Sequence, residues 1–125
     1  MKIYIAASSQ TQAKAAADLC VAAGHTITSR WLDVPFDRTV TYTEDQRREI
    51  AQYDYDDVVA SDALVCLESD HLIPGGKFVE VGIALGTDKL VVAIGKRENM
   101  LMWHPAISAC KSVEEFIELH AIAFA

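Results

Sequence analysis

The sequence is poor in basic residues, in cysteine and in long apolar runs, and each shortage argues against a class of protein. Its 125 residues carry 11 Lys and Arg against 18 Asp and Glu, a net charge of −7. Proteins that bind nucleic acid polymers need a basic surface, so we expect no such partner. The three cysteines show no C-x-x-C spacing, which argues against a zinc cluster or a disulfide framework and favours a reducing compartment. No apolar run approaches the roughly 20 residues that cross a bilayer, and the N-terminal run is too short for a signal peptide. We therefore expect a cytoplasmic protein without a membrane partner.

The glycines and histidines also lack the arrangements that hold nucleotides or metals. Neither the G-x-G-x-x-G of dinucleotide-binding domains nor the G-x-x-x-x-G-K-[ST] of nucleotide kinases occurs. The four histidines show no metal-ligand spacing such as H-E-x-x-H. A phospho-receiver domain needs acidic residues at the end of its first strand, where residues 6–9 read Ala-Ala-Ser-Ser. We therefore expect neither a metal nor a cofactor.

Short apolar runs alternate with helical patterns along the whole chain. The apolar runs predict strands at residues 3–7, 25–30, 63–67, 90–94 and 107–110, and the helical patterns lie at residues 11–23, 43–60, 77–85 and 112–124. Two of these helices begin with the spacing of a capping box, Thr43-x-x-Gln46 and Ser112-x-x-Glu115. The helix at 77–85 has few polar positions, which predicts that it is well buried.

Strands that are apolar on both faces and alternate with helices indicate a parallel sheet covered on both sides. We predict one α/β domain over residues 1–125, doubly wound in the flavodoxin-like or Rossmann-like manner, with a five-stranded parallel sheet. The strand at 25–30 alternates apolar and polar residues, which is typical of an edge. Ligands of such sheets bind beyond the carboxyl ends of the strands, so the loops expected to matter are residues 8–11, 68–76 and 95–100.

Glu80 is the first candidate for chemistry. It lies in the first turns of the helix predicted at 77–85, which follows Gly75 and Gly76 beyond the third strand. A helix N-terminus stabilises an ionised carboxylate, and this one is expected to face the ligand crevice. The alternative is that Glu80 only complements the helix dipole, as many first-turn glutamates do.

A second carboxylate is expected from the run of aspartates at 54, 56 and 57. Helical spacing places Ile50, Asp54 and Asp57 or Val58 on one side of the helix, so one acid of the run can face the ligand end of the sheet. A solvated acidic face explains such a run equally simply, and the spacing does not choose among the three aspartates. Two carboxylates that converge on one crevice are what the cleavage of a glycosidic bond requires.

Several stretches resemble the nucleoside 2-deoxyribosyltransferase family. They are GGKFVEVGIALG at residues 75–86, KLVV at 89–92, GKREN at 95–99 and IYIA at 3–6, with an aspartate at position 54, eight positions before Asp62. The resemblance extends from the first strand to about Pro105. It implies an enzyme that cleaves the N-glycosidic bond of a (deoxy)nucleoside through a glutamate nucleophile and a glycosyl-enzyme intermediate.

The resemblance also implies a role for individual residues. Glu80 matches the nucleophile, and Asp54 matches the aspartate beside the leaving base, which selects it among the three aspartates. Tyr4 matches a tyrosine that holds the nucleophile in position. Asn99 matches a polar residue that one subunit donates across an interface to the 5′ end of the sugar in its neighbour, which implies a homo-oligomer.

One position departs from the family pattern. Members that exchange bases on free nucleosides carry a second aspartate six positions before the nucleophile, where this chain has Pro74. Related members hydrolyse nucleoside 5′-monophosphates and use the loop after the first strand to hold the phosphate. Ser8 and Ser9 offer donors in that loop, although plain N-capping explains them as well. Lys77 is the nearby cation.

The predicted substrate-binding residues are therefore Ser8, Ser9, Gly75, Gly76, Lys77 and Asn99. The substrate is expected to be a nucleoside or a nucleoside monophosphate. Two alternatives to a transferase stay open: a nucleoside 5′-monophosphate N-glycosidase that passes the sugar to water, and a nucleotide-sensing module without turnover.

Overall fold

A computed structural model describes residues 1–34, 39–69 and 75–121 of the chain. Its five strands are β1 (Lys2–Ala6), β2 (Thr26–Ile27), β3 (Ala63–Leu67), β4 (Leu90–Ile94) and β5 (Ile107–Cys110). Its helices are α1 (Gln10–Ala22), α2 (Glu44–Val59), α3 (Gly76–Gly86) and α4 (Val113–Leu119), with short 3-10 helices η1 (Arg30–Asp33) and η2 (Met100–Trp103). No helix in these ranges is long and apolar enough to cross a membrane.

The five strands form one parallel sheet in the order β2-β1-β3-β4-β5. This is the doubly wound α/β fold that the sequence predicts, with β2 at an edge as expected. The chain runs outward from β1 to β2 and then crosses back to β3 on the other side of β1. The carboxyl ends of β1 and β3 therefore flank the point where the strand order reverses, which is where ligands of such folds bind.

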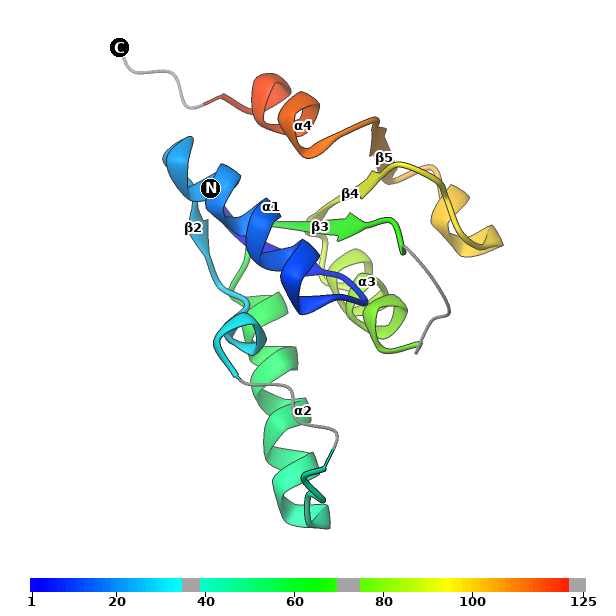
Figure 1. Cartoon of the computed structure of the whole chain (residues 1–125). Coiled ribbons are helices and arrows are strands. Elements are labelled where there is room, and N and C mark those ends of the chain that lie inside the picture. The colour runs from blue at the N-terminus through cyan, green and yellow to red at the C-terminus, as the bar shows by residue number, and fades with distance from the viewer. Residues whose placement is uncertain (35–38, 70–74, 122–125) are drawn as a thin grey trace.

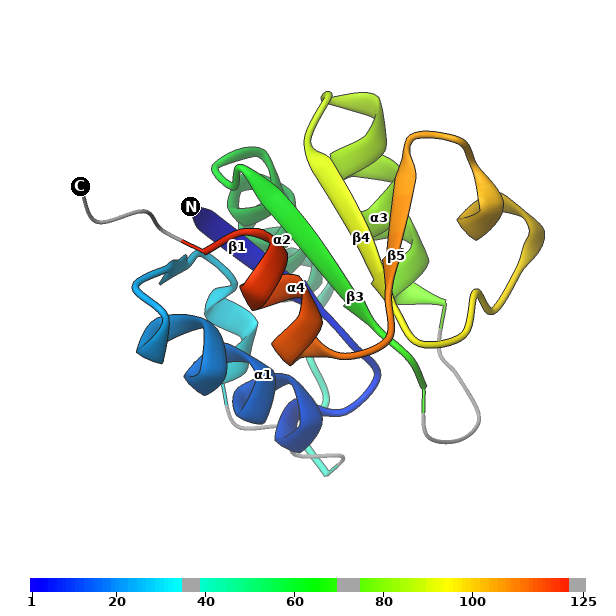
Figure 2. The same cartoon turned by 90° about the horizontal axis from the view of Figure 1, so that it is seen from above.

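Helices cover both faces of the sheet, α1 and α4 on one and α2 and α3 on the other (Figures 1 and 2). Because side chains alternate along a strand, β1 sends Ile3 and Ile5 into the first core and Tyr4 and Ala6 into the second. All four are fully buried. Tyr4 is thus placed under α2 and α3, the two helices that carry the candidate carboxylates.

Helix α2 projects well beyond the sheet (Figure 1). It begins with the predicted capping box: the Thr43 hydroxyl accepts from the Gln46 amide at 3.1 Å, and the Gln46 side chain accepts from the Thr43 amide at 2.8 Å. Of its 16 residues only Asp57 and Val58 are buried. The packing of α2 on the domain is therefore concentrated in its last turns, next to the sheet.

Two predicted elements, the strand at 25–30 and the helix at 112–124, differ from the structure by more than one residue at an end, and one predicted capping box is only half formed. Strand β2 has two residues instead of six, because the Ser29 hydroxyl accepts the Ile5 amide at 3.1 Å and so replaces the next rung of the ladder. Helix α4 ends at Leu119 instead of about residue 124, and residues 122–125 lie outside the described residues. Of its predicted capping box the structure shows one half, in which the Ser112 hydroxyl accepts the Glu115 amide at 3.1 Å.

The expectation that the helix at 77–85 is well buried is wrong. Lys77, Val81 and Ala84 are buried, but Val79 on the outer side of α3 is 64% exposed. Only one side of the helix packs on the sheet, so its apolar outer side is left uncovered.

Candidate functional site

Three side chains predicted to act together, Tyr4, Asp54 and Glu80, lie near one another where α2 and α3 cover β1. Tyr4 comes from β1, Asp54 from the part of α2 nearest the sheet, and Glu80 from the second turn of α3. They lie close enough that the charges of Glu80 and Asp54 both raise the pKa of the Tyr4 hydroxyl, in addition to the larger effect of its burial. Residues 26 to 76 positions apart in sequence are thus neighbours at the switch point of the sheet.

The Glu80 carboxyl has a strongly perturbed protonation equilibrium. Its pKa is raised from an ordinary value of 4.5 to about 7. Burial is the largest cause, the charge of Asp54 acts in the same direction, and the Tyr4 hydroxyl acts in the opposite direction. Oε2 of Glu80 is buried without a hydrogen-bond partner in the described part of the chain. A desolvated carboxylate with a free oxygen is a stronger nucleophile than one that is fully hydrogen-bonded.

The Tyr4 hydroxyl lies beside this carboxylate but does not form a regular hydrogen bond with it. It is close enough to influence the pKa of Glu80, yet the phenolic oxygen makes no well-aligned hydrogen bond to any described residue. Buried hydroxyls normally have a partner, since an unpaired one costs free energy. Tyr4 and Glu80 therefore each have a buried polar oxygen without a hydrogen-bond partner among the described residues, and the two side chains are neighbours.

Asp54 is half-buried, and its carboxyl is also shifted toward the protonated form. Burial raises its pKa, the neighbouring charge of Asp57 raises it further, and Arg30 lowers it. A carboxyl with a raised pKa keeps its proton to a higher pH than usual, which suits an acid that acts on a leaving group.

A feature that the sequence did not reveal is the clamp between Arg30 and Asp57. The Asp57 carboxylate accepts from the Arg30 amide at 3.0 Å and from its guanidinium Nε at 2.9 Å, and Nη2 lies 2.8 Å from Oδ1. The Thr28 hydroxyl donates to the Asp57 carbonyl oxygen at 2.9 Å. These contacts anchor the end of α2 to the segment after β2, and with it Asp54 one turn earlier. Sequence spacing grouped Asp57 with Asp54, but nothing in the sequence identified Arg30 as its partner.

The loop between β1 and α1 holds Ser8 and Ser9. The Ser9 side chain accepts from the Gln12 amide at 3.3 Å and caps α1, which is the capping role already weighed against substrate binding. Oγ of Ser8 is buried and has no partner in the described residues. Of the two serines, Ser8 therefore has the unused hydrogen-bonding capacity.

Gly75 and Gly76 lie at the start of α3, Gly75 as the residue before the helix and Gly76 as its first residue. A methyl group added at either glycine would meet no described atom within 4 Å. Contacts with the described residues therefore do not require glycine at either position. Pro74, the position that departs from the family pattern, lies outside the described residues.

Lys77 is buried and its ammonium group already has three acceptors within the protein. Its side chain is 1% exposed, and Nζ lies 2.5 Å from Oε2 of Glu98, 2.9 Å from the Leu67 carbonyl oxygen and 2.5 Å from Oγ of Ser69. These three acceptors match the three protons of the ammonium group. Glu98, which the sequence did not single out, is the charge partner of the predicted cation.

Asn99 is exposed and caps η2, where its Oδ1 accepts from the Met102 amide at 3.2 Å. Within the described residues, Asn99 makes no hydrogen bond or ion pair with Tyr4, Asp54 or Glu80. The residues beside it are unusually apolar for a surface: Met100 is 86%, Leu101 79% and Trp103 65% exposed. We call these three residues the η2 patch.

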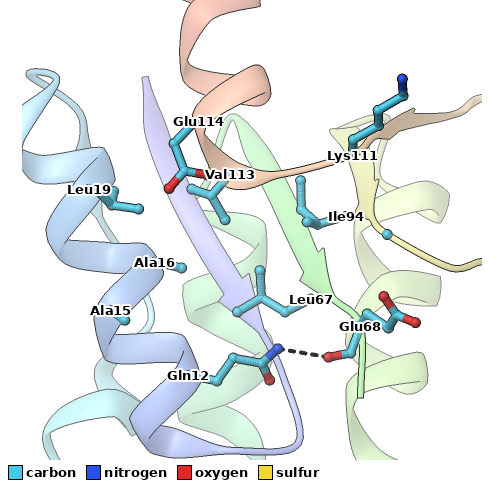
Figure 3. Close-up of a pocket in the computed structure, with 11 residues that line it drawn as sticks. Gln12, Ala15, Ala16, Leu19, Leu67, Glu68, Ile94, Lys111, Val113 and Glu114 are labelled. Atoms are coloured by element: carbon cyan, nitrogen blue, oxygen red, sulfur yellow. Dashed lines mark hydrogen bonds between the residues drawn. The ribbon is translucent and has the colours of Figure 1, made fainter. Parts of the chain in front are cut away.

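A separate cavity of about 270 Å³ lies on the other face of the sheet, between α1 and α4 (Figure 3). Its apolar floor includes Ala16, Leu67 and Ile94, and at its edge the Gln12 side chain donates to the Glu68 carbonyl oxygen at 2.8 Å. These floor residues belong to the core under α1 and α4, not to the one that contains Tyr4. The apolar floor of this cavity thus lies on the opposite face of the sheet from Tyr4.

Solved structures resemble this chain over its whole length. No protein-family model and no curated protein matches the sequence. A 2-deoxyribosyltransferase from the psychrotolerant bacterium Bacillus psychrosaccharolyticus superimposes with a TM-score of 0.70 at 19% identity, over 99% of this chain and 93% of that one. A CMP N-glycosidase from Clostridium botulinum superimposes with a TM-score of 0.61 at 12% identity, over 96% of this chain and 98% of that one. At these identities the likeness shows that the chain shares their fold.

Proposed function

We propose that the protein is a member of the nucleoside 2-deoxyribosyltransferase family and cleaves the N-glycosidic bond of a (deoxy)nucleoside. The observation that carries this proposal is the buried Glu80 carboxyl, with one oxygen unpaired, beside Tyr4 and Asp54 at the switch point of the sheet. The fold shared with a deoxyribosyltransferase and an N-glycosidase supports the same assignment.

In the proposed reaction Glu80 is the nucleophile. Its free carboxylate oxygen attacks C1′ of the sugar and forms an ester, while the bond from C1′ to the base nitrogen breaks and its electron pair leaves with the base. Asp54 donates its proton to the departing base. An acceptor base or a water molecule then attacks C1′ from the opposite side, releases Glu80 as a carboxylate and restores the original stereochemistry, with Asp54 taking back the proton of the attacking group.

The environment of each carboxyl supports its role. Glu80 must be ionised to attack, and a pKa of about 7 leaves a substantial ionised fraction in neutral solution. Asp54 must carry a proton, and burial together with the charge of Asp57 favours that form. Tyr4 limits the rise in the pKa of Glu80, and its unpartnered hydroxyl is the group proposed to orient the carboxylate when substrate is bound.

A free nucleoside is the substrate that the charges favour. Lys77, the cation expected to hold a phosphate, is buried and paired with Glu98, and Arg30 is paired with Asp57. Asp54, Asp57 and Glu80 each raise the pKa of the Tyr4 hydroxyl, and an ionised Glu80 repels a dianion. Ser8 favours the alternative, a nucleoside 5′-monophosphate N-glycosidase, because its unpartnered hydroxyl next to the start of α1 could donate to a phosphate.

We further propose that the active protein is a homo-oligomer in which Asn99 reaches the site of a neighbouring subunit. The η2 patch supports this assembly, because three adjacent large apolar side chains with most of their surface in water are typical of an interface. Val79 on α3 is a further exposed apolar side chain.

The experiment is a substrate screen. The protein is incubated with deoxynucleosides, ribonucleosides and their 5′-monophosphates, with and without an acceptor base, and the released bases are followed by chromatography. Base exchange that needs the acceptor supports a transferase, and release of base from monophosphates alone supports the hydrolase. The variant Glu80→Gln should lose activity at least a thousandfold, whereas Glu118→Gln on the exposed side of α4 should retain it. Binding without turnover on every substrate would overturn the proposal in favour of a sensing module.

A further inference from the structure

Lys77 and Glu98 form a buried ion pair to which the proposed reaction gives no part. Their side chains are 1% and 11% exposed, and Nζ lies 2.5 Å from Oε2. The second oxygen, Oε1, accepts from the Ser69 amide at 2.8 Å. Although burial alone would raise the pKa of Glu98, the bonds from Lys77 and Ser69 lower it below its ordinary value. The pair is therefore held as two charges with their hydrogen bonds largely satisfied.

The contacts of this pair join three segments of the chain. Leu67, whose carbonyl oxygen accepts from Lys77, is the last residue of β3. Lys77 itself lies in the first turn of α3, one turn before Glu80. Glu98 belongs to the segment between β4 and η2 and directly precedes Asn99. All three segments lie at the carboxyl edge of the sheet, where the ligand is expected.

A buried ion pair is a poor way to gain stability but a good way to fix geometry. Removing two charges from water costs about as much as their attraction returns, and apolar residues of similar size would stabilise the domain as well. The pair instead fixes the relative positions of the segments it joins. The ammonium group needs its three acceptors at defined positions, and these acceptors come from two different loops and a strand end.

We propose that Lys77 and Glu98 are positioning residues, which hold the helix that carries Glu80 at a fixed place relative to the segment that presents Asn99. Lys77 then contributes to the reaction without touching the substrate. This inference rests on the proposed function for its catalytic consequence, but the mechanical link between α3 and the segment after β4 is independent of it.

The kinetic test is a double-mutant cycle. Lys77→Met and Glu98→Gln are each expected to lower kcat about 10- to 100-fold, because a displacement of about 1 Å at a reacting group has effects of that order. KM should change less than threefold, and the double variant should be no slower than the slower single variant. Losses that multiply in the double variant would overturn the proposal, as would a rise in KM for 5′-monophosphates alone in Lys77→Met, which would identify Lys77 as a phosphate ligand.

The structural test is amide hydrogen exchange measured by mass spectrometry. Lys77→Met should accelerate exchange in residues 95–103, which are remote from position 77 in sequence, whereas Lys14→Met on the exposed side of α1 should leave that segment unchanged. If Lys77→Met does not fold, Glu98→Gln serves instead, read out in the first turns of α3. Unchanged exchange in the remote segment would overturn the proposal. If the wild-type protein cleaves no substrate, the proposed function fails, and exchange alone then decides whether the pair couples the two segments.

Discussion

Replacing Glu80 by glutamine should stabilise the protein at pH 8 while it removes the proposed activity. The folded protein holds the Glu80 carboxyl with a pKa of about 7, whereas the unfolded chain returns it to its ordinary value of 4.5. Ionising the group is therefore more costly in the folded state than in the unfolded state. Glutamine has nearly the same shape and no charge, so the variant avoids this cost.

The size and the sign of the effect follow from these two values. The difference between 7 and 4.5 corresponds to about 3 kcal/mol of unfolding free energy, as an upper bound. The wild type has this contribution in full below about pH 4.5, because Glu80 is then protonated in both states, and it loses it as the pH rises through 7. The variant does not. We expect the two proteins to unfold alike at pH 4.5 and to differ by up to about 10 °C in Tm at pH 8.

Thermal unfolding followed by circular dichroism between pH 4.5 and pH 8.5 measures this difference directly. Glu118→Gln, which removes an exposed carboxylate from α4, controls for the loss of one negative charge and should follow the wild type throughout. Equal Tm values for Glu80→Gln and wild type at pH 8 would refute the argument, and so would a difference that grows on acidification. Either result would mean that water or a partner relieves the carboxylate in the folded protein.

Three further outcomes follow from the same structure. Tyr4→Phe should move the acidic limb of the pH–rate profile to higher pH, because the Tyr4 hydroxyl lowers the pKa of Glu80 and its removal raises that pKa. An acidic limb that stays in place would show that Tyr4 does not influence the ionisation of Glu80. Leu101→Glu should reduce both the mass measured by light scattering and the activity, whereas Leu119→Glu, also exposed but on α4, should change neither; an unchanged mass for Leu101→Glu would show that the η2 patch is not part of an interface. Val58→Ala should lower the free energy of unfolding by about 2 kcal/mol in urea titrations, because the side chain is fully buried at the anchored end of α2; a loss below 0.5 kcal/mol would show that this end packs loosely.

The central strands of the sheet and the start of α2 were predictable from local sequence. β3 and β4 match their predicted ranges residue for residue, because continuous apolar runs bounded by polar residues leave little freedom of register. The start of α2 follows from Thr43 and Gln46, whose side chains bond only to near neighbours. Such features depend on few residues and short separations.

The interactions that shape the candidate site were less predictable, because they join distant segments. Arg30 and Asp57 are 27 positions apart, and Lys77 and Glu98 are 21 apart, so no periodicity or motif links either pair. Lys77 was predicted to bind substrate as the one cation near the loop that follows the first strand. In the structure its ammonium group contacts the carboxylate of Glu98, which lies in a distant part of the sequence. The convergence of Tyr4, Asp54 and Glu80 was expected from family resemblance and fold topology together, not from spacing alone.

The alternation of side chains along β1 has a practical consequence. Ile3 and Ile5 face one layer of helices and Tyr4 faces the other, so a change made under α1 and α4 has a full sheet between it and the proposed chemistry. The cavity in Figure 3 opens on that far layer and is bordered by Lys111 and Glu114. Reporter dyes, surface tethers or stabilising substitutions at Glu114 on α4, rather than at the loop residues Glu68 and Gly95 that also line the cavity, should leave the turnover of the protein unchanged.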